Sequence, residues 1–230
     1  MWTGNMQERI LYEDDAIIVC HKPSGIAVQS AGVGQMDLES ALRNYLAGKK
    51  QNAEGIPYLA VIHRLDQPVE GVMVFAKTPR AAKELNRQIS AKEITKEYLA
   101  AVSVRPESDR GALEDYLLKD GKSNTSRVVP KGTPGAKPAS LQYALERVSG
   151  IGVEGTRYFV VRIRLETGRH HQIRVQMAHA GMPLVGDRKY NPGDMSGETL
   201  GLCAVKLEFR HPVHKGAMCM TINPENRIFA

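Results

Sequence analysis

The hydrophobic pattern of this chain switches repeatedly between a period of two residues and the longer period of a helix. Residues 158–165 alternate apolar and polar side chains, which predicts a half-buried strand. Residues 37–47 and the segment that begins at Thr78-Pro79 instead carry apolar stripes at helical spacing. Strands and helices are therefore interleaved, but without the regular alternation of a parallel βαβ sheet. We predict an α+β fold, with a mixed, largely antiparallel β-sheet flanked by helices, as one domain over residues 1–230.

Several classes of protein are disfavoured by composition. Residues 1–10 lack the apolar stretch of a signal peptide, and no run is long enough to span a bilayer. Three widely spaced cysteines, Cys20, Cys203 and Cys219, argue against a disulfide framework and for a reducing compartment. We therefore expect a cytoplasmic protein that has no membrane association.

The net charge of +6 is concentrated toward the C-terminus. Residues 131–230 hold 14 basic and 8 acidic side chains, whereas residues 1–60 hold 5 and 7. The densest basic cluster consists of Arg157, Arg162, Arg164, Arg169, Arg174, Arg188 and Lys189. Guanidinium groups suit contacts with phosphates, so the cluster fits an RNA-binding surface, and it fits a salt-bridged strand face equally well. Residues 106–138 are rich in Lys, Gly, Ser and Pro, which predicts a protruding, partly mobile segment.

Two motifs point to cofactors but lack the required context. Gly150-Ile151-Gly152-Val153-Glu154-Gly155 matches the dinucleotide-binding pattern, yet a strand rather than a helix follows it, which favours a hairpin loop. The histidines His170, His171, His179, His211 and His214 match no common zinc spacing. We therefore predict neither a metal nor a nucleotide cofactor.

A single carboxylate has the strongest functional position. Asp66 ends the run Val61-Ile62-His63-Arg64-Leu65-Asp66, and Pro68 and a strand-like apolar run follow it. A carboxylate at such a strand-to-turn boundary can be held rigidly and still face a ligand. The alternative is a plain ion pair with Arg64, since residues two apart share one face of a strand.

Longer blocks of sequence resemble the RluA-type pseudouridine synthases. In order along the chain, the matching runs are YEDDAIIVCHKPSGIAVQS from Tyr12, HRLDQPVEGVMVFAKT from His63, KEYLAAV from Lys96, TGRHHQIRVQMAHAGMPLVGDRKY from Thr167 and LCAVKLEFRHP from Leu202. They span nearly the whole chain, which makes the match more specific than any short motif. One departure is Val69-Glu70 before Gly71, where many members carry Thr-Ser.

The resemblance implies the pseudouridine synthase catalytic fold and an enzyme that isomerises uridine in ribosomal or transfer RNA. It implies that Asp66 is the catalytic residue and that Arg174 is its ion-pair partner, which would hold the carboxylate ionised and oriented. Tyr98 resembles the tyrosine that packs on the target base, although a core aromatic residue on a strand explains it too. Whether Asp66 acts as nucleophile or as base stays open.

The resemblance also implies a set of substrate contacts. Arg64 resembles the arginine that enters the space left by a flipped nucleotide, and His63 precedes it in the same block. Ile173 and Leu202 resemble apolar residues that wall the uracil pocket, and a plain core role is at least as good an explanation. For the RNA backbone we predict contacts from Lys122, Lys131, Lys137, Arg162, Arg164, Arg169 and Lys189.

Alternatives from other classes are a catalytically inactive RNA-binding or ribosome-assembly factor on the same fold, and a cofactor-dependent oxidoreductase. An inactive RNA-binding factor would not require Asp66, Tyr98 and Arg174 together. The oxidoreductase alternative rests on the glycine pattern rejected above. We expect a monomer with RNA as its partner, no cofactor, no metal and no separate N-terminal RNA-binding domain.

Overall fold

A computed structural model of the protein describes residues 5–30, 36–49, 55–151, 157–194 and 196–229. The chain forms two compact units. Unit 1 comprises Met1–Ile94 and Lys206–Ile222, and unit 2 comprises Thr95–Val205 and Asn223–Ala230. Strand β10 (Leu202–Arg210) contributes its first residues to unit 2 and its last residues to unit 1. A single catalytic domain over the whole chain stays a prediction.

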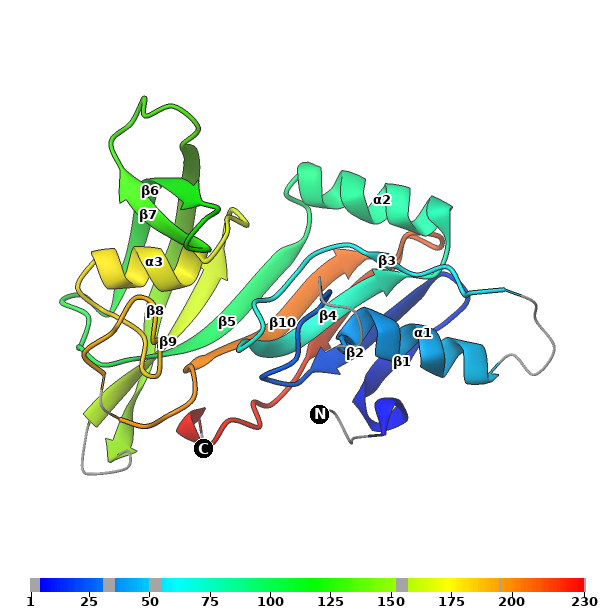
Figure 1. The fold of residues 1–230 in the computed structure, drawn as a ribbon, viewed down its shortest axis with the longest axis horizontal. Helices are drawn as coiled ribbons and strands as arrows, with labels where there is room; N and C mark the ends of the chain where they lie inside the picture. Colours follow the sequence, from blue (N-terminus) through cyan, green and yellow to red (C-terminus); the bar gives the residue numbers. More distant parts are fainter. Residues whose placement is uncertain (1–4, 31–35, 50–54, 152–156, 195, 230) are drawn as a thin grey trace. The chain divides into compact units, whose positions relative to one another are not determined.

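Unit 1 is built on strands that pair in an antiparallel manner, with helices outside them (Figure 1). Strand β2 pairs with β1 on one side and with β4 on the other, and the register of β2 with β4 places Lys22 opposite Gly71. Its elements are η1 (Met6–Arg9), β1 (Ile10–Glu13), β2 (Ile17–Lys22), α1 (Leu38–Lys49), β3 (Ala60–Val61), β4 (Glu70–Ala76), α2 (Pro79–Ser90), the end of β10, and β11 (Ala217–Thr221).

Helix α2 shows how local sequence and packing agree in unit 1. The Thr78 side chain accepts a hydrogen bond from the Ala81 N–H at 3.2 Å, and Pro79 occupies the first helical position, as the sequence predicts. Ala81 and Leu85 are fully buried in a core that also contains residues of β2, β4 and β10. Because every residue of β2 and β4 is buried, this pair of strands is a rigid base for the segments at its ends.

Unit 2 is an antiparallel sheet in the order β5-β9-β8-β6-β7. Helix α3 contacts β6 and β7 at one end of this sheet (Figure 1). The elements are β5 (Thr95–Val102), β6 (Arg110–Asp120), β7 (Thr125–Val129), β8 (Lys137–Ile151), β9 (Arg157–Leu165), α3 (Gln172–His179), the start of β10, and η3 (Arg227–Phe229).

The predicted fold class is confirmed, and two details need comment. Residues 106–138 contain more regular structure than their composition suggests, because β6, β7 and the start of β8 form a paired ladder there. The composition did not indicate these strands because one face of each is polar and solvated. The partial mobility of this segment stays a prediction.

The glycine motif joins the antiparallel neighbours β8 and β9, as expected for a hairpin, although residues 152–156 lie outside the described residues. Among the described residues, no helix is long and apolar enough to cross a membrane.

Candidate functional site

Asp66 lies in the connection between β3 and β4, immediately before β4 begins at Glu70. Its carbonyl accepts a hydrogen bond from the Val69 N–H at 3.0 Å, which closes a four-residue turn with Pro68 at the third position. The Asp66 side chain is half-buried. The strand-to-turn boundary predicted from the sequence is therefore confirmed, and it places a carboxylate just before β4, a strand whose residues are all buried.

Lys22, the last residue of β2, and the residues that follow it hold this turn through its carbonyl groups. The Lys22 Nζ donates to Pro23 O at 3.0 Å, to Gln67 O at 3.1 Å and to Val69 O at 2.6 Å. The Ser24 hydroxyl donates to the carbonyl of the third turn residue at 2.8 Å, and the Gly25 N–H donates to Gln67 O at 2.9 Å. The carbonyls of residues 67, 68 and 69 are thus all bonded by residues 22–25, so the backbone that carries Asp66 is fixed.

Lys22 is among the largest fully buried side chains of the described residues. Burial lowers the pKa of Lys22 to about 8, while the charges of Asp66 and Glu70 act in the opposite direction. The sequence analysis predicted no role for Lys22, although this residue lies in the matching block that begins at Tyr12. Its partners lie 45 and 47 residues away, so no local pattern could identify them.

Glu70 explains the departure from the common Thr-Ser pair. Its carboxylate is buried and lies 2.8 Å from the Nε2 of His21, which is also buried. The two side chains come from the paired strands β2 and β4, directly behind the Asp66 turn. A buried carboxylate is tolerated only when it is hydrogen-bonded, and His21 supplies such a bond here.

Arg64 and His63 lie on the approach to the turn. Arg64 is exposed and lines an open pocket of about 400 Å³ together with His63, Gln29 and Glu39. The Val74 N–H donates to His63 Nε2 at 3.3 Å, so this ring also ties the loop to β4. The exposure of Arg64 suits a side chain that contacts a large ligand, and substrate contacts by both residues stay predictions.

In unit 2, Arg174 makes a buried two-pronged ion pair with Asp187. Arg174 Nε lies 2.8 Å from Asp187 Oδ2, and Arg174 Nη2 lies 2.8 Å from Asp187 Oδ1. The two residues are 5% and 1% exposed, so the guanidinium and the carboxylate lie inside the core of unit 2. The sequence analysis assigned no role to Asp187, so its function as the anchor of Arg174 was missed.

The Asp187 carboxylate is itself held by the loop that follows α3. Its Oδ1 accepts hydrogen bonds from the N–H groups of Lys189 at 3.0 Å and Tyr190 at 3.2 Å, and the Arg174 guanidinium lies 5.3 Å from the centre of the Tyr190 ring. Gly186 adopts φ +73°, and a Cβ there would meet the Thr199 carbonyl oxygen at 2.3 Å. Glycine is therefore required immediately before Asp187.

The remaining predicted pocket residues are buried in unit 2. Tyr98 is 6% exposed, Ile173 is 4% exposed and Leu202 is 5% exposed. This burial fits both the pocket and the core interpretations. Burial lowers the pKa of Lys96, two residues before Tyr98 on β5, to about 8. Asp66 belongs to unit 1, whereas Arg174 and Tyr98 belong to unit 2, so the Asp66–Arg174 ion pair stays a prediction.

The predicted RNA-backbone residues divide into two groups. Lys122, Lys131, Lys137 and Lys189 are exposed, and Lys189 Nζ donates to Asn124 O in the β6–β7 turn at 2.8 Å. The arginines of β9 and its following turn have protein partners instead. Arg162 lies 2.7 Å from Glu146 and 3.4 Å from Glu97, Arg164 lies 3.5 Å from Glu166, and Arg169 Nε donates to Pro138 O at 2.9 Å. The Arg157 side chain lies outside the described residues.

The salt-bridged interpretation therefore describes much of the β9 face. Arg174, counted with the same cluster in the sequence, is buried and does not belong to this surface. The lysines of the β6–β7 hairpin and its neighbourhood are the exposed cations that best fit an RNA backbone. RNA contacts by either group stay predictions.

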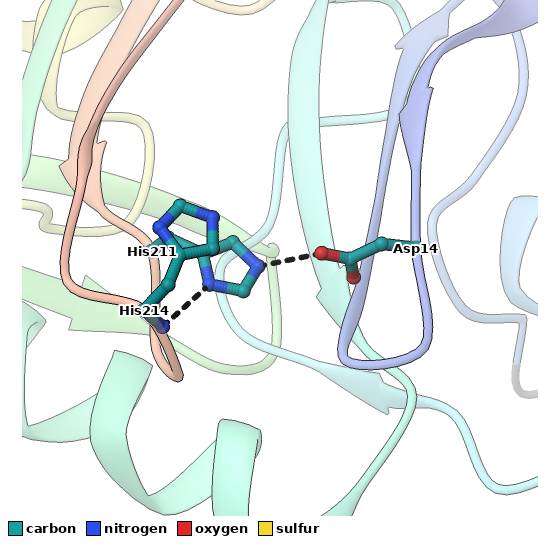
Figure 2. Close-up of side chains that lie close together, drawn as sticks. All are labelled: Asp14, His211 and His214. Carbon is teal, nitrogen blue, oxygen red and sulfur yellow. Dashed lines mark hydrogen bonds and ion pairs between the residues drawn. The ribbon is translucent and has the colours of Figure 1, made fainter.

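One cluster of possible metal ligands, Asp14, His211 and His214, lies in unit 1 (Figure 2). His211 Nε2 lies 2.8 Å from Asp14 Oδ2, and His211 Nδ1 accepts the His214 N–H at 3.2 Å. The centres of the two imidazole rings are 3.7 Å apart and the interplanar angle is 2°, so their lone pairs lie in two separate, parallel planes and do not converge on one ion. The arrangement is better explained by hydrogen bonds that connect the turn at Asp14 with the turn at His211–His214 than by a metal site.

Comparison with known proteins identifies relatives over most of the chain. The profile of the family described as RNA pseudouridylate synthase matches residues 16–179. Ribosomal large subunit pseudouridine synthase C of Haemophilus influenzae is 31% identical over 217 residues, which are 90% of this chain and 62% of that protein. Ribosomal large subunit pseudouridine synthase D of Vibrio cholerae is 37% identical over 89% of this chain and 63% of its own length. The chain thus spans less than two thirds of the length of these relatives.

Solved structures with the same fold include two human proteins. Human RNA pseudouridylate synthase domain containing 4 matches with a TM-score of 0.73 at 22% identity, covering 96% of this chain and 90% of that chain. Human RNA pseudouridylate synthase domain containing 1 matches with a TM-score of 0.74 at 21% identity, covering 97% and 86%. These similarities show the fold and confirm the predicted mixed, largely antiparallel architecture.

Proposed function

Because the chain belongs to the RNA pseudouridylate synthase family, we propose that it isomerises uridine to pseudouridine in structured RNA. The observation that carries the proposal is Asp66, a half-buried carboxylate on a turn whose carbonyl groups are held by residues 22–25. Pure RNA binding requires no such fixed carboxylate. Relatives named as ribosomal large subunit pseudouridine synthases make ribosomal RNA the first candidate substrate, with transfer RNA as the second.

The proposed reaction breaks the N1–C1′ glycosidic bond, rotates the uracil and joins its C5 to C1′. One carboxylate serves this chemistry by stabilising positive character at the sugar, by attacking as a nucleophile or by removing a sugar proton. Water must be excluded, because hydrolysis would release the base. No net redox change occurs, so we propose that the enzyme uses no cofactor and no metal.

The other residues have supporting roles in this proposal. Arg174, oriented by Asp187, is proposed to pair with Asp66, and Tyr98 to pack on the uracil. Ile173 and Leu202 are proposed to wall the base, and the exposed Arg64, next to His63, to enter the space that the flipped nucleotide leaves. A cytoplasmic location and a monomeric state remain part of the same proposal and can be tested by cell fractionation and sedimentation.

The direct test combines in vitro transcribed large-subunit ribosomal RNA, transfer RNA and the wild-type or Asp66→Asn protein. Pseudouridine is measured after exhaustive chelation and without added nucleotide. We expect product from the wild type and none from Asp66→Asn, while RNA affinity changes by less than about threefold, because removing one charge barely alters a phosphate-dominated interface.

Turnover by Asp66→Asn above a few per cent of the wild-type rate would contradict the assignment of Asp66. Activity restored only by a metal or a nucleotide would contradict the cofactor-free chemistry. RNA binding without any product from the wild-type protein, on either RNA, would support the inactive RNA-binding alternative.

A further inference from the structure

Lys22 is matched to its surroundings only when it is charged. An ammonium group has three N–H donors, and three main-chain carbonyls accept from it, at 3.0 Å from Pro23, 3.1 Å from Gln67 and 2.6 Å from Val69. A neutral amine has two donors and would leave one of these carbonyls without its bond from Lys22. Two of the three acceptors belong to the turn that begins at Asp66, so the protonation of Lys22 and the geometry of this turn are linked.

We propose that Lys22 is a positioning residue for Asp66, because its ammonium fixes the Asp66–Val69 turn and supplies a positive charge behind the carboxylate, so that only charged Lys22 supports full turnover. This inference rests on the proposed function. Lys22 acts through the turn and is not assigned a contact with RNA. A lysine that only filled space would need no donor for each of these carbonyls.

The groups that face Lys22 predict how its charge responds to pH. Burial lowers the pKa of Lys22 to about 8, and Asp66 on the turn and Glu70 on β4 raise it again in part. Cys20 on β2 is fully buried, which raises the pKa of its thiol to about 12, so it stays neutral in this range. His21 bonds Glu70 at 2.8 Å and thereby fixes the carboxylate that favours charged Lys22. Activity should therefore decrease as pH rises above about 8.

The test is single-turnover kinetics on the RNA that the wild type modifies, from pH 6.5 to 9.5, with RNA affinity measured in parallel. For the wild type we expect the rate to fall about tenfold per pH unit well above the midpoint. Lys22→Met should lose at least about a hundredfold in rate at neutral pH, with RNA affinity within about threefold, since the lost interactions position Asp66 and do not bind RNA. Lys22→Arg, if it folds, should keep part of the activity and lose the alkaline decrease.

Two further variants separate positioning by charge from simple support of the fold. Glu70→Gln removes a charge that favours the ammonium, so the midpoint of the alkaline decrease should move to lower pH. Ser24→Ala removes one neutral bond to the same turn, at Pro68 O, and should leave the midpoint unchanged. If Lys22→Arg does not fold, the Glu70→Gln variant still tests whether the charge of Lys22 controls the decrease in rate at alkaline pH.

The inference is wrong where folded Lys22→Arg retains the alkaline decrease, where Glu70→Gln leaves its midpoint unmoved, or where the wild type has no such decrease. Lys96 has a similarly lowered pKa, so Lys96→Arg is measured as well, and loss of the decrease in that variant alone would assign it to Lys96. An inactive Asp66→Asn with unaffected Lys22 variants rejects this inference and leaves the proposed function standing. A wild type without product rejects the function itself.

Discussion

The Arg174–Asp187 ion pair of unit 2 is buried, with both side chains almost fully inaccessible. Removing one partner of such a pair leaves an uncompensated buried charge, which costs about 3 to 5 kcal/mol. We therefore expect Arg174→Ala to lower the free energy of unfolding by this amount and to lose most of the activity of the folded fraction. Arg174→Lys should recover only part, because an ammonium lacks the two-pronged geometry.

Urea denaturation and single-turnover rates of the folded protein test this expectation together. Arg162→Ala is a matched stability control, since its guanidinium also bonds carboxylates but its side chain is 40% exposed. It should cost less than about 1 kcal/mol. Wild-type activity in folded Arg174→Ala would reject its pairing with Asp66.

The role of a single residue was predictable from the sequence where a long matching block and the local pattern both pointed to it. It was not predictable where the role depends on a contact with a residue far away in the sequence. Asp66 stands out because a strand-like run changes to a turn around it, and the structure places it there. Lys22 and Asp187 stand in the matching blocks as well, yet their partners are main-chain carbonyls and a guanidinium that only the folded chain brings near. Local patterns do not encode such contacts.

At the scale of elements, the β6–β7 hairpin was the least predictable part. The first half of β6 alternates exposed and partly buried positions, and Lys, Gly and Ser are frequent in the neighbouring turns, so the composition resembles that of a loop. Pairing with β8 gives the hairpin its order. Helix α2 was predictable because Thr78-Pro79 specifies its start locally, whereas the strands of unit 2 depend on neighbours far away in the sequence.

The exposed lysines near this hairpin predict how RNA binding depends on salt. Replacing Lys122, Lys131 and Lys137 by alanine together removes three cations from the surface of unit 2. Each phosphate contact releases counterions, so the slope of log affinity against log salt should decrease by about one per lysine removed, without a change in the modified uridine. Affinity measured over a salt series for wild type and variant provides the test.

The control removes the same charge elsewhere. Arg80, Lys83 and Lys92 are exposed on or just after α2 in unit 1, and their triple alanine variant should keep the wild-type slope. Equal changes in both triple variants would indicate a nonspecific effect of net charge. An unchanged slope in the hairpin variant would mean that these lysines do not contact RNA.

At the scale of the whole molecule, the buried Lys22 and the half-buried Lys96 make stability depend on alkaline pH. Burial lowers the pKa of both Lys22 and Lys96 from 10.5 to about 8. Above pH 8 the unfolded chain therefore holds more protons on these lysines than the folded chain does, and the free energy of unfolding rises with pH. The rise is up to about 1.4 kcal/mol per pH unit for each lysine. Buried Cys20 has the opposite effect above pH 9, where its thiol ionises in the unfolded chain but stays protonated in the fold.

We therefore expect urea denaturation to show increasing stability from pH 7.5 to pH 9, with a smaller increase in Lys22→Met and a smaller one still in Lys22→Met/Lys96→Met. Over the same interval the activity of the wild type should decrease, because the neutral amine of Lys22 no longer bonds all three carbonyls. Opposite trends in stability and activity cannot arise from partial unfolding at alkaline pH, since unfolding would lower both. Stability that decreases between pH 7.5 and pH 9, to the same extent in the wild type and both variants, would show that folding lowers the pKa of neither lysine.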